Sequence, residues 1–149
     1  MVGRPLVAPI IMALFMLAVL GLAYPLATYA VGRAVAPWRS SGSLLAINGV
    51  AVGSYLVAQN VSSAALFQPM PGSTSGQDPY VPLNYALEQV PRISRATGIP
   101  QAELRRLVYR VAAEDSRVVP ALLGPGYPLV NVEQLNYELM RLYPAIYGR

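Results

Sequence analysis

The pattern of apolar and polar positions sets one long uncharged segment apart from the rest of the chain. No charged side chain occurs in residues 5–32, between Arg4 and Arg33. A helix needs about 20 residues to cross about 30 Å of hydrocarbon, and residues 6–26 alone supply that length. This segment therefore predicts a single transmembrane helix.

The same segment also has features of a secretory signal peptide, whose apolar core is usually only about 7–15 residues long. Small residues at 28–30 and 34–36 resemble cleavage sites, so a cleaved signal is the alternative to a retained anchor of residues 1–35. Arginines flank both ends of the segment, so the charge bias that normally marks the cytoplasmic side nearly cancels.

After the anchor, the apolar residues occur in short runs of the length typical of β-strands. Residues 43–54 hold two apolar runs around Asn48-Gly49, a dipeptide suited to the positive φ angles of a type I′ turn, which predicts a β-hairpin. Residues 55–80 are rich in Ser, Gly, Gln, Asn and Pro and are expected to form an ordered loop. Within it, residues 68–79 have the composition of a binding loop.

Two segments then follow helical spacing. The first, residues 81–98, begins near Pro82 and ends at Gly98, with Pro91 expected to kink it. The second, residues 100–115, is amphipathic. The positions expected to be buried are Tyr85, Ala86, Gln89, Val90, Ile93 and Ala96 in the first and Leu104, Leu107, Val108 and Val111 in the second.

The last segment, residues 127–144, predicts a short strand at 129–130 and then a helix. Asn131 is the expected cap, and Gln134 stands where the partner in a capping box would be. The expected buried positions are Val132, Leu135, Leu139 and Leu142. Residues 36–149 therefore form an α+β domain, with a short antiparallel sheet covered on one side by about three helices.

Composition narrows the chemistry that this domain can perform. The chain has no His, Cys or Lys, which excludes thiolate nucleophiles, Ser-His-Asp triads, Schiff bases and nearly every transition-metal site. All eleven basic residues are arginine. Two of them flank the apolar segment, and the other nine are nearly balanced in number by seven acidic residues. That balance does not indicate nucleic-acid binding, which calls for a clustered basic face.

Any catalysis would depend on carboxylates, Ser, Tyr or Arg. Six of the seven acids lie in predicted helices or at their ends, where we expect them on solvated faces. The acids are Asp78, Glu88, Glu103, Glu114, Asp115, Glu133 and Glu138. No catalytic, cofactor-binding or metal-ligating residue is predicted.

Several local motifs occur in an order and spacing that resemble one protein family across nearly the whole chain. They are LGLAYPL (20–26), GSLL (42–45), AQN (58–60), FQPMPGS (67–73), SGQDPY (75–80), ALEQVPRISRATGI (86–99) and VNVEQLNYEL (130–139). Together with the amino-terminal span, they resemble the C subunit of the Kdp potassium-transporting P-type ATPase, the KdpC family.

The chain departs from the family pattern at several points. Ala58 replaces a frequent Gly, Val61 a Phe, residues 70–72 an Arg-Pro-Ser stretch, and Tyr80 a His. Many members also carry a longer segment where this chain passes from 71 to 75 in a few residues. Functions tied to those features are not carried over to this chain.

The resemblance implies an accessory subunit in a pump with three other subunits. KdpA is channel-like and selects potassium, KdpB hydrolyses ATP, and the small KdpF stabilises the assembly; ATP, magnesium and potassium are used by the complex. The C subunit is expected to be a single-pass protein of the cell membrane, with residues 36–149 outside the cytoplasm beside KdpA. The alternative is an independent tethered domain that binds a ligand or acts as an enzyme.

Candidate partner-contact or structural residues follow from the family motifs and from the polar positions of the loop and helices. They are Gln59, Asn60, Pro71, Ser75, Gly76, Asp78, Pro79, Gln89, Arg92, Asn131 and Asn136. Gln59-Asn60 is interpreted as a turn, with contact to the channel mouth as the alternative. Asp78 either stabilises the turn before the helix or faces the partner with its loop.

Two further hypotheses concern the loop and the span. Residues 73–77 faintly resemble a family stretch linked to ATP affinity, but a loop outside the cytoplasm meets no ATP. The span is either only an anchor or an interface that packs small residues against helices of the pump. Those small residues are Ala13, Ala18, Gly21, Ala23 and Ala27.

Overall fold

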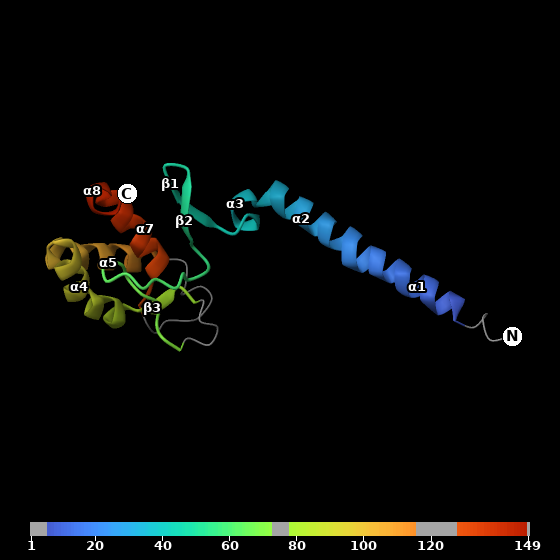
Figure 1. Cartoon of the computed structure of the whole chain (residues 1–149), viewed down its shortest axis with the longest axis horizontal. Coiled ribbons are helices and arrows are strands. Elements are labelled where there is room, and N and C mark those ends of the chain that lie inside the picture. Colours follow the sequence, from blue (N-terminus) through green and yellow to red (C-terminus); the bar gives the residue numbers. More distant parts are fainter. Residues whose placement is uncertain (1–5, 73–77, 116–127, 149) are drawn as a thin grey trace. The chain divides into compact units, whose positions relative to one another are not determined.

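The structure is a computed structural model that describes residues 6–72, 78–115 and 128–148. The chain forms two compact units, Met1–Gly42 and Ser43–Arg149. Figure 1 shows the elements of each unit along the chain. The α+β class, with one amino-terminal apolar helix and a small domain of short antiparallel strands and several helices, is confirmed.

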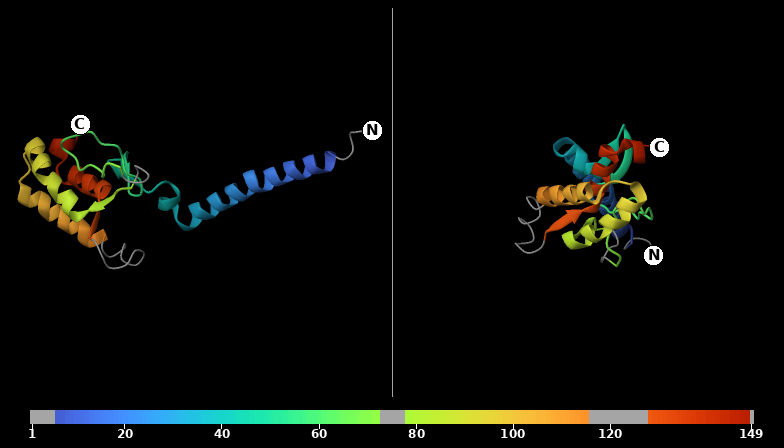
Figure 2. Two further views of the ribbon diagram at one scale, coloured as in Figure 1. Left: turned by 90° about the horizontal axis from the view of Figure 1, so that it is seen from below. Right: turned by 90° about the vertical axis from the view of Figure 1, so that its left-hand side faces the viewer.

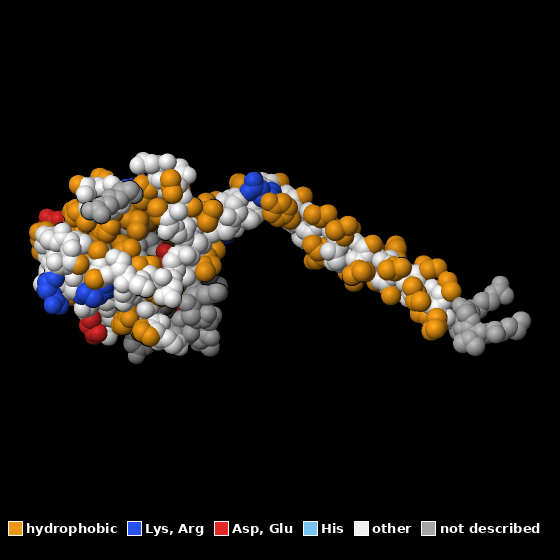
Figure 3. All heavy atoms as spheres, viewed as in Figure 1, with side chains coloured by type: hydrophobic (Ala, Val, Ile, Leu, Met, Phe, Trp, Pro, Cys, Tyr) orange, Lys and Arg blue, Asp and Glu red, His pale blue; other side chains and the backbone are white. Residues whose placement is uncertain are grey.

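The first unit is dominated by one continuous helix, Val7–Val35, of 29 residues. Its length and composition are sufficient to cross a membrane, and Figure 3 shows apolar side chains along its whole length. It consists of α1 (Val7–Ala18), a π-helical turn η1 (Val19–Ala23) and α2 (Tyr24–Val35), and the short helix α3 (Pro37–Ser40) follows.

The second unit begins with the predicted hairpin. Strands β1 (Leu44–Ile47) and β2 (Val50–Ser54) pair antiparallel, with an irregularity between Leu45 and Ala46. Asn48 and Gly49 have φ angles of 52° and 80°, the positive values that a type I′ turn requires. The hairpin prediction is therefore confirmed.

The other strands form a separate sheet. Strands β3 (Tyr80–Pro82) and β4 (Leu129–Asn131) pair antiparallel, with Val81 opposite Val130. The single predicted sheet is thus two sheets of two strands each among the described residues. Neither is wide enough to stand alone, so both depend on packing against helices.

The described residues of the second unit also include four helices. They are α4 (Leu83–Thr97), α5 (Gln101–Asp115), α7 (Val132–Leu142) and α8 (Pro144–Tyr147). Gly98 ends α4 with a φ of 77°, as predicted, because this left-handed conformation costs glycine little. Figure 2 shows α5 beside both α4 and α7, in agreement with the contacts between these helices.

The core lies among α4, α5, α7 and the β3–β4 pair. Its largest fully buried side chains include Ile93, Leu104, Leu135, Leu139 and Phe67, and Phe67 comes from the long loop after β2. Most of the predicted buried positions are confirmed, but Ala96 is exposed and Leu142 is 47 % exposed. Both lie in the last turns of their helices.

Candidate functional site

Residues 55–72 form an extended loop that contains no helix or strand; we call it the long loop. Backbone N–H and C=O groups still need partners wherever they are buried. In the long loop, many of these partners are side chains of distant helices. The loop is therefore an ordered surface with a fixed shape.

Two side-chain amides each hold one residue of the long loop by two hydrogen bonds. Asn136 of α7 accepts from the N–H of Phe67 at 2.8 Å and donates to its carbonyl oxygen at 2.9 Å. Gln89 of α4 does the same for Gln68, at 2.8 Å and 3.0 Å. Each amide supplies the donor and acceptor that a neighbouring strand would otherwise provide.

Arg92 holds the outer part of the same loop. Its guanidinium donates to the carbonyl oxygens of Ser63, Ala64 and Leu66 at 3.2 Å, 2.7 Å and 2.9 Å. The same side chain donates to Gln89 Oε1 at 2.8 Å, so the two supporting residues brace each other. The planar fork of arginine donors suits several carbonyls at once, which an ammonium group would match poorly.

The start of the long loop meets α5 and β4 at a buried polar junction. Asp115 accepts from the N–H of Asn131 at 2.8 Å and from the Tyr55 hydroxyl at 3.1 Å. Asn131 caps α7 by accepting from the N–H groups of Glu133 and Gln134, and its Nδ2 donates to Tyr55 O at 2.8 Å. The expected capping-box bond to the Asn131 N–H is thus made by Asp115, whereas Gln134 was predicted.

Glu133 forms a further contact with the long loop. It is 4 % exposed, and its Oε1 accepts from the N–H of Gln59 at 2.6 Å. Its Oε2 faces Gly53, where an added Cβ would lie 2.7 Å from that oxygen. Only glycine at position 53 lets the carboxylate approach the hairpin this closely.

Burial raises the pKa of both carboxylates. For Asp115 the loss of solvation outweighs the hydrogen bonds from Asn131 and Tyr55, which lower the pKa. For Glu133 the same loss outweighs the bond from Gln59. Burial likewise raises the pKa of Tyr55. These groups favour their uncharged forms more than free side chains do.

The expectation that the helix acids lie on solvated faces is wrong for three of them. Asp115, Glu133 and Glu138 are 3 %, 4 % and 8 % exposed. The burial of Asp115 could have been predicted, because it follows Leu104, Val108 and Val111 at helical spacing on the buried face of α5. The contacts of Glu133 could not, because only the fold brings Gln59 and Gly53 to it.

The predicted residues divide between the supports and the surface of the long loop. Gln89, Arg92, Asn131 and Asn136 are all supports. Gln59 and Asn60 are exposed, and Gln59 Nε2 donates to Val57 O at 3.3 Å, which is the local bond that a turn interpretation expects. Asn60 and Pro71 line one open surface pocket of the loop, together with Val61, Ser62, Gln68, Pro69, Met70 and Gly72.

The remaining predicted residues lie just before β3. Asp78 Oδ1 accepts from the N–H of Tyr80 at 2.9 Å, as a side chain that stabilises a turn does. Pro79 is buried, and its carbonyl oxygen accepts from the N–H of Val132 at 2.8 Å. Ser75 and Gly76 lie outside the described residues.

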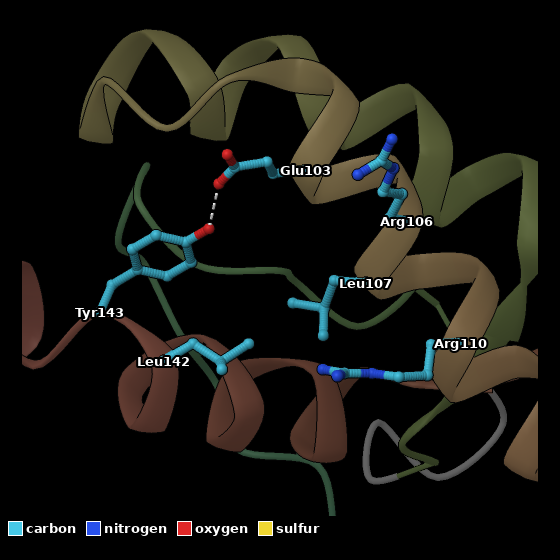
Figure 4. A pocket seen from close by; sticks show the side chains of 6 residues that line it. All are labelled: Glu103, Arg106, Leu107, Arg110, Leu142 and Tyr143. Carbon is cyan, nitrogen blue, oxygen red and sulfur yellow. Dashed lines mark hydrogen bonds between the residues drawn. The ribbon is translucent and has the colours of Figure 1, made fainter.

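A second pocket lies between α5 and the carboxyl-terminal end of α7 (Figure 4). Its charged groups are largely engaged already. The Tyr143 hydroxyl donates to Glu103, and Arg110 lies 3.4 Å from Glu138. Leu107 and Leu142 lie between these groups and make the floor of the pocket apolar. Because the Tyr143 hydroxyl and the Glu103 carboxylate already bond to each other, they are not free to act as a nucleophile or a base.

The described residues contain no group of three His, Cys, Asp or Glu side chains placed to hold a metal ion. The long loop is the best candidate for a functional surface, because distant side chains hold its backbone in one shape. Its chemistry is that of binding: neutral amides, hydroxyls and backbone groups are presented on a preformed shape.

Comparison with known proteins identifies a family for this arrangement. The model of the KdpC family, described as "K+-transporting ATPase, c chain", matches residues 6–73 and 70–141. The chain is 30 % identical to the potassium-transporting ATPase KdpC subunit of Kineococcus radiotolerans, over 84 % of this chain and 87 % of the relative. The same subunit of Caulobacter vibrioides is 30 % identical, over 85 % and 88 %. That of Cereibacter sphaeroides is 28 % identical, over 80 % and 87 %.

These matches also locate the difference in loop length. The two segments of the family match meet at residues 70–73, at the end of the long loop. The alignment with the Kineococcus protein extends over 177 positions, more than the 149 residues of this chain, so that relative carries additional residues.

Proposed function

Because the chain belongs to the KdpC family of potassium-transporting ATPase subunits, we propose that it is a non-catalytic accessory subunit that assembles and stabilises the pump. Its direct partners are the channel-like KdpA, the ATPase KdpB and the small KdpF. ATP, magnesium and potassium are used by the complex, and no cofactor-binding or metal-ligating residue is assigned to this chain. The Val7–Val35 helix stays in the membrane as a single span, and the second unit lies outside the cytoplasm.

The observation that carries this proposal is the construction of the long loop. Four predicted polar residues, Gln89, Arg92, Asn131 and Asn136, are used to hold its backbone, while Gln59 and Asn60 remain at its surface. A loop that is already ordered loses little conformational entropy when a partner binds. This supports a docking surface more than a catalytic one.

The experiment is purification of the tagged full-length chain from its native membranes in mild detergent. Identification of the co-purifying chains is followed by an assay of potassium-stimulated ATP hydrolysis. We expect a channel-like chain and a P-type ATPase chain in fixed proportion, with potassium-dependent activity in the purified assembly. A solitary chain from membranes that contain the other subunits would contradict the proposal and favour an independent tethered domain.

A second purification tests the long loop itself. Asn60→Asp places a charge on its surface without touching the supports, and Gln101→Glu adds the same charge at an exposed position of α5 as a matched control. We expect the Asn60 variant to lower recovery of the other subunits and the control to leave it unchanged. Equal recovery of both would remove this part of the loop from the contact surface.

A further inference from the structure

The apolar helix is interrupted by one wide turn near its middle. In η1 the N–H of Tyr24 bonds to the carbonyl oxygen of Val19, five residues back, where an α-helix would bond four residues back. Pro25 follows immediately. Its ring has no N–H and would clash with the Gly21 carbonyl in a regular α-helix, which explains why the turn widens here.

This turn leaves two consecutive carbonyl groups without their α-helical donors. The donor for Leu20 would be the N–H of Tyr24, which bonds to Val19. The donor for Gly21 would be the N–H of residue 25, which proline lacks.

The helix has no side chain of its own to replace these donors. Residues 7–23 contain no hydroxyl, amide or charged side chain. Thr28 Oγ1 donates to Tyr24 O at 3.1 Å and to Pro25 O at 3.0 Å, so it serves carbonyls later in the helix. The Tyr24 side chain is exposed, and its hydroxyl makes no hydrogen bond to another described residue.

The position of the turn in the sequence makes the lost bonds costly. Leu20 and Gly21 lie about midway between Arg4 and Arg33, at the centre of the uncharged segment. In a bilayer this is the depth at which neither water nor lipid tails donate hydrogen bonds, and each unpaired backbone group costs several kcal/mol.

The turn is also open to a close approach. A Cβ added to Gly21 would meet, within 4 Å, only the side chain of Leu17, with its nearest atom at 3.4 Å. Small residues at this kind of position let a second helix come close enough for side chains to reach the backbone.

We infer that the Val19–Pro25 turn is a docking site for a transmembrane helix of another pump subunit, one with a hydroxyl, amide or indole N–H at mid-membrane. This inference depends on the proposed function, which supplies both the bilayer and the partner. The partner side chain donates to the Leu20 or Gly21 carbonyl. A second copy of this chain matches less well, because its residues 7–23 contain no side-chain donor and only its Tyr24 hydroxyl, from beyond the turn, could reach toward these carbonyls.

The test is a competition within the assembled complex. Each tagged variant is co-expressed with untagged wild-type chain and with the other pump subunits, and the complex is purified through a tag on the ATPase subunit. The ratio of variant to wild-type chain in the complex, divided by their ratio in the membrane, measures relative docking strength.

Two variants and one matched control carry the test. Pro25→Ala restores the backbone N–H, so that the helix becomes regular and the Leu20 and Gly21 carbonyls regain donors. Gly21→Ala keeps the wide turn but adds a methyl group where the partner helix would approach. Both should be depleted about three- to tenfold in the complex. Pro9→Ala removes the other proline of this helix, in the first turn of α1, where the N–H has no intrahelical partner, and should compete evenly.

Each outcome decides between the two claims. Depletion of the Gly21 and Pro25 variants alone supports the docking turn. If all three variants compete evenly with wild type, the docking turn is overturned and the accessory function is unaffected. The same conclusion follows if the Pro9 variant is depleted as strongly as the Gly21 and Pro25 variants. Failure of the wild-type chain to enter the complex overturns the proposed function and the docking turn with it.

Discussion

The apolar helix and the long loop satisfy their backbone polar groups in opposite ways. The helix pairs its N–H and C=O groups with each other along 29 residues, and this pattern is interrupted at the η1 turn, where Pro25 has no N–H to donate. The loop has no regular structure and depends on side chains that are distant in the sequence, such as Asn136 for Phe67. A helix therefore satisfies its own backbone hydrogen bonds except where a donor is missing. The shape of this loop, in contrast, depends on the packing that brings its supporting side chains together.

The largest expected effect is the loss of an amide support. Asn136→Leu leaves the buried N–H and C=O of Phe67 without partners and should lower the free energy of unfolding by about 3 kcal/mol. Thermal or urea unfolding of the full chain in detergent measures this. The same substitution at exposed Asn60 should change stability by less than about 0.5 kcal/mol. Similar losses at both sites would show that the loop does not depend on this support.

A smaller effect is expected at the guanidinium support. Arg92→Lys keeps the charge but cannot match three loop carbonyls and Gln89, so stability should fall by about 1–2 kcal/mol. Hydrogen exchange and limited proteolysis should increase within residues 60–68. Arg95→Lys is the control, because exposed Arg95 bonds only to Pro91 O in its own helix. Unchanged exchange in the Arg92 variant would contradict the proposed role.

The buried carboxylate of Glu133 gives a pH-dependent test. Its pKa is raised above the ordinary 4.5, so between 4.5 and the raised value the folded state holds more protons than the unfolded state. This group's contribution to stability is therefore full below pH 4.5 and is lost as pH rises through the raised pKa.

Glu133→Gln keeps an acceptor for the Gln59 N–H and removes the ionisation. We expect the variant to be about 1 kcal/mol more stable than wild type at pH 7 and equal to it near pH 4. Unfolding measured at both pH values checks this. Glu88→Gln, at an exposed position of α4, should show no such difference. A Glu133 variant that is less stable at pH 7 would mean that the ionised carboxylate is favourable in place.

The smallest effect on stability is expected at the turn before β3. Asp78→Ala loses one exposed hydrogen bond to the Tyr80 N–H and should cost about 0.5–1 kcal/mol, while recovery of the other pump subunits falls. Asp78→Asn retains the acceptor and separates the two roles. If Asn restores assembly, the turn geometry matters; if it does not, the charge contacts the partner. Charge reversal at exposed Arg105 should be mild, and normal assembly of the Asp78→Ala variant would refute the prediction.

Local elements of the fold were predictable because their signals lie within a few residues. The Asn48-Gly49 turn, the end of α4 at Gly98 and the Asn131 cap follow from backbone preferences and short hydrogen bonds. The strand pairing was predicted less well. Periodicity located the apolar runs, but it could not show that β3 pairs with β4, where the paired residues Val81 and Val130 are 49 positions apart.

The candidate site followed a similar division. Gln89, Arg92, Asn131 and Asn136 were selected as polar residues of family motifs, but their shared role as supports was not visible in the sequence. Tyr55 and Glu133 were missed, and Asp115 was assigned to a solvated face although its helical spacing placed it among buried residues.

The sequence by itself determined the long apolar helix, the hairpin, the bounds of the main helices and the absence of His, Cys and Lys chemistry. These properties depend on composition, on periodicity and on contacts within one or two turns. Only the tertiary structure decided which polar side chains hold the long loop and which carboxylates are buried. The reason is that these hydrogen bonds join positions 69 or 74 residues apart, as in Phe67–Asn136 and Gln59–Glu133, and exist only after the core has packed.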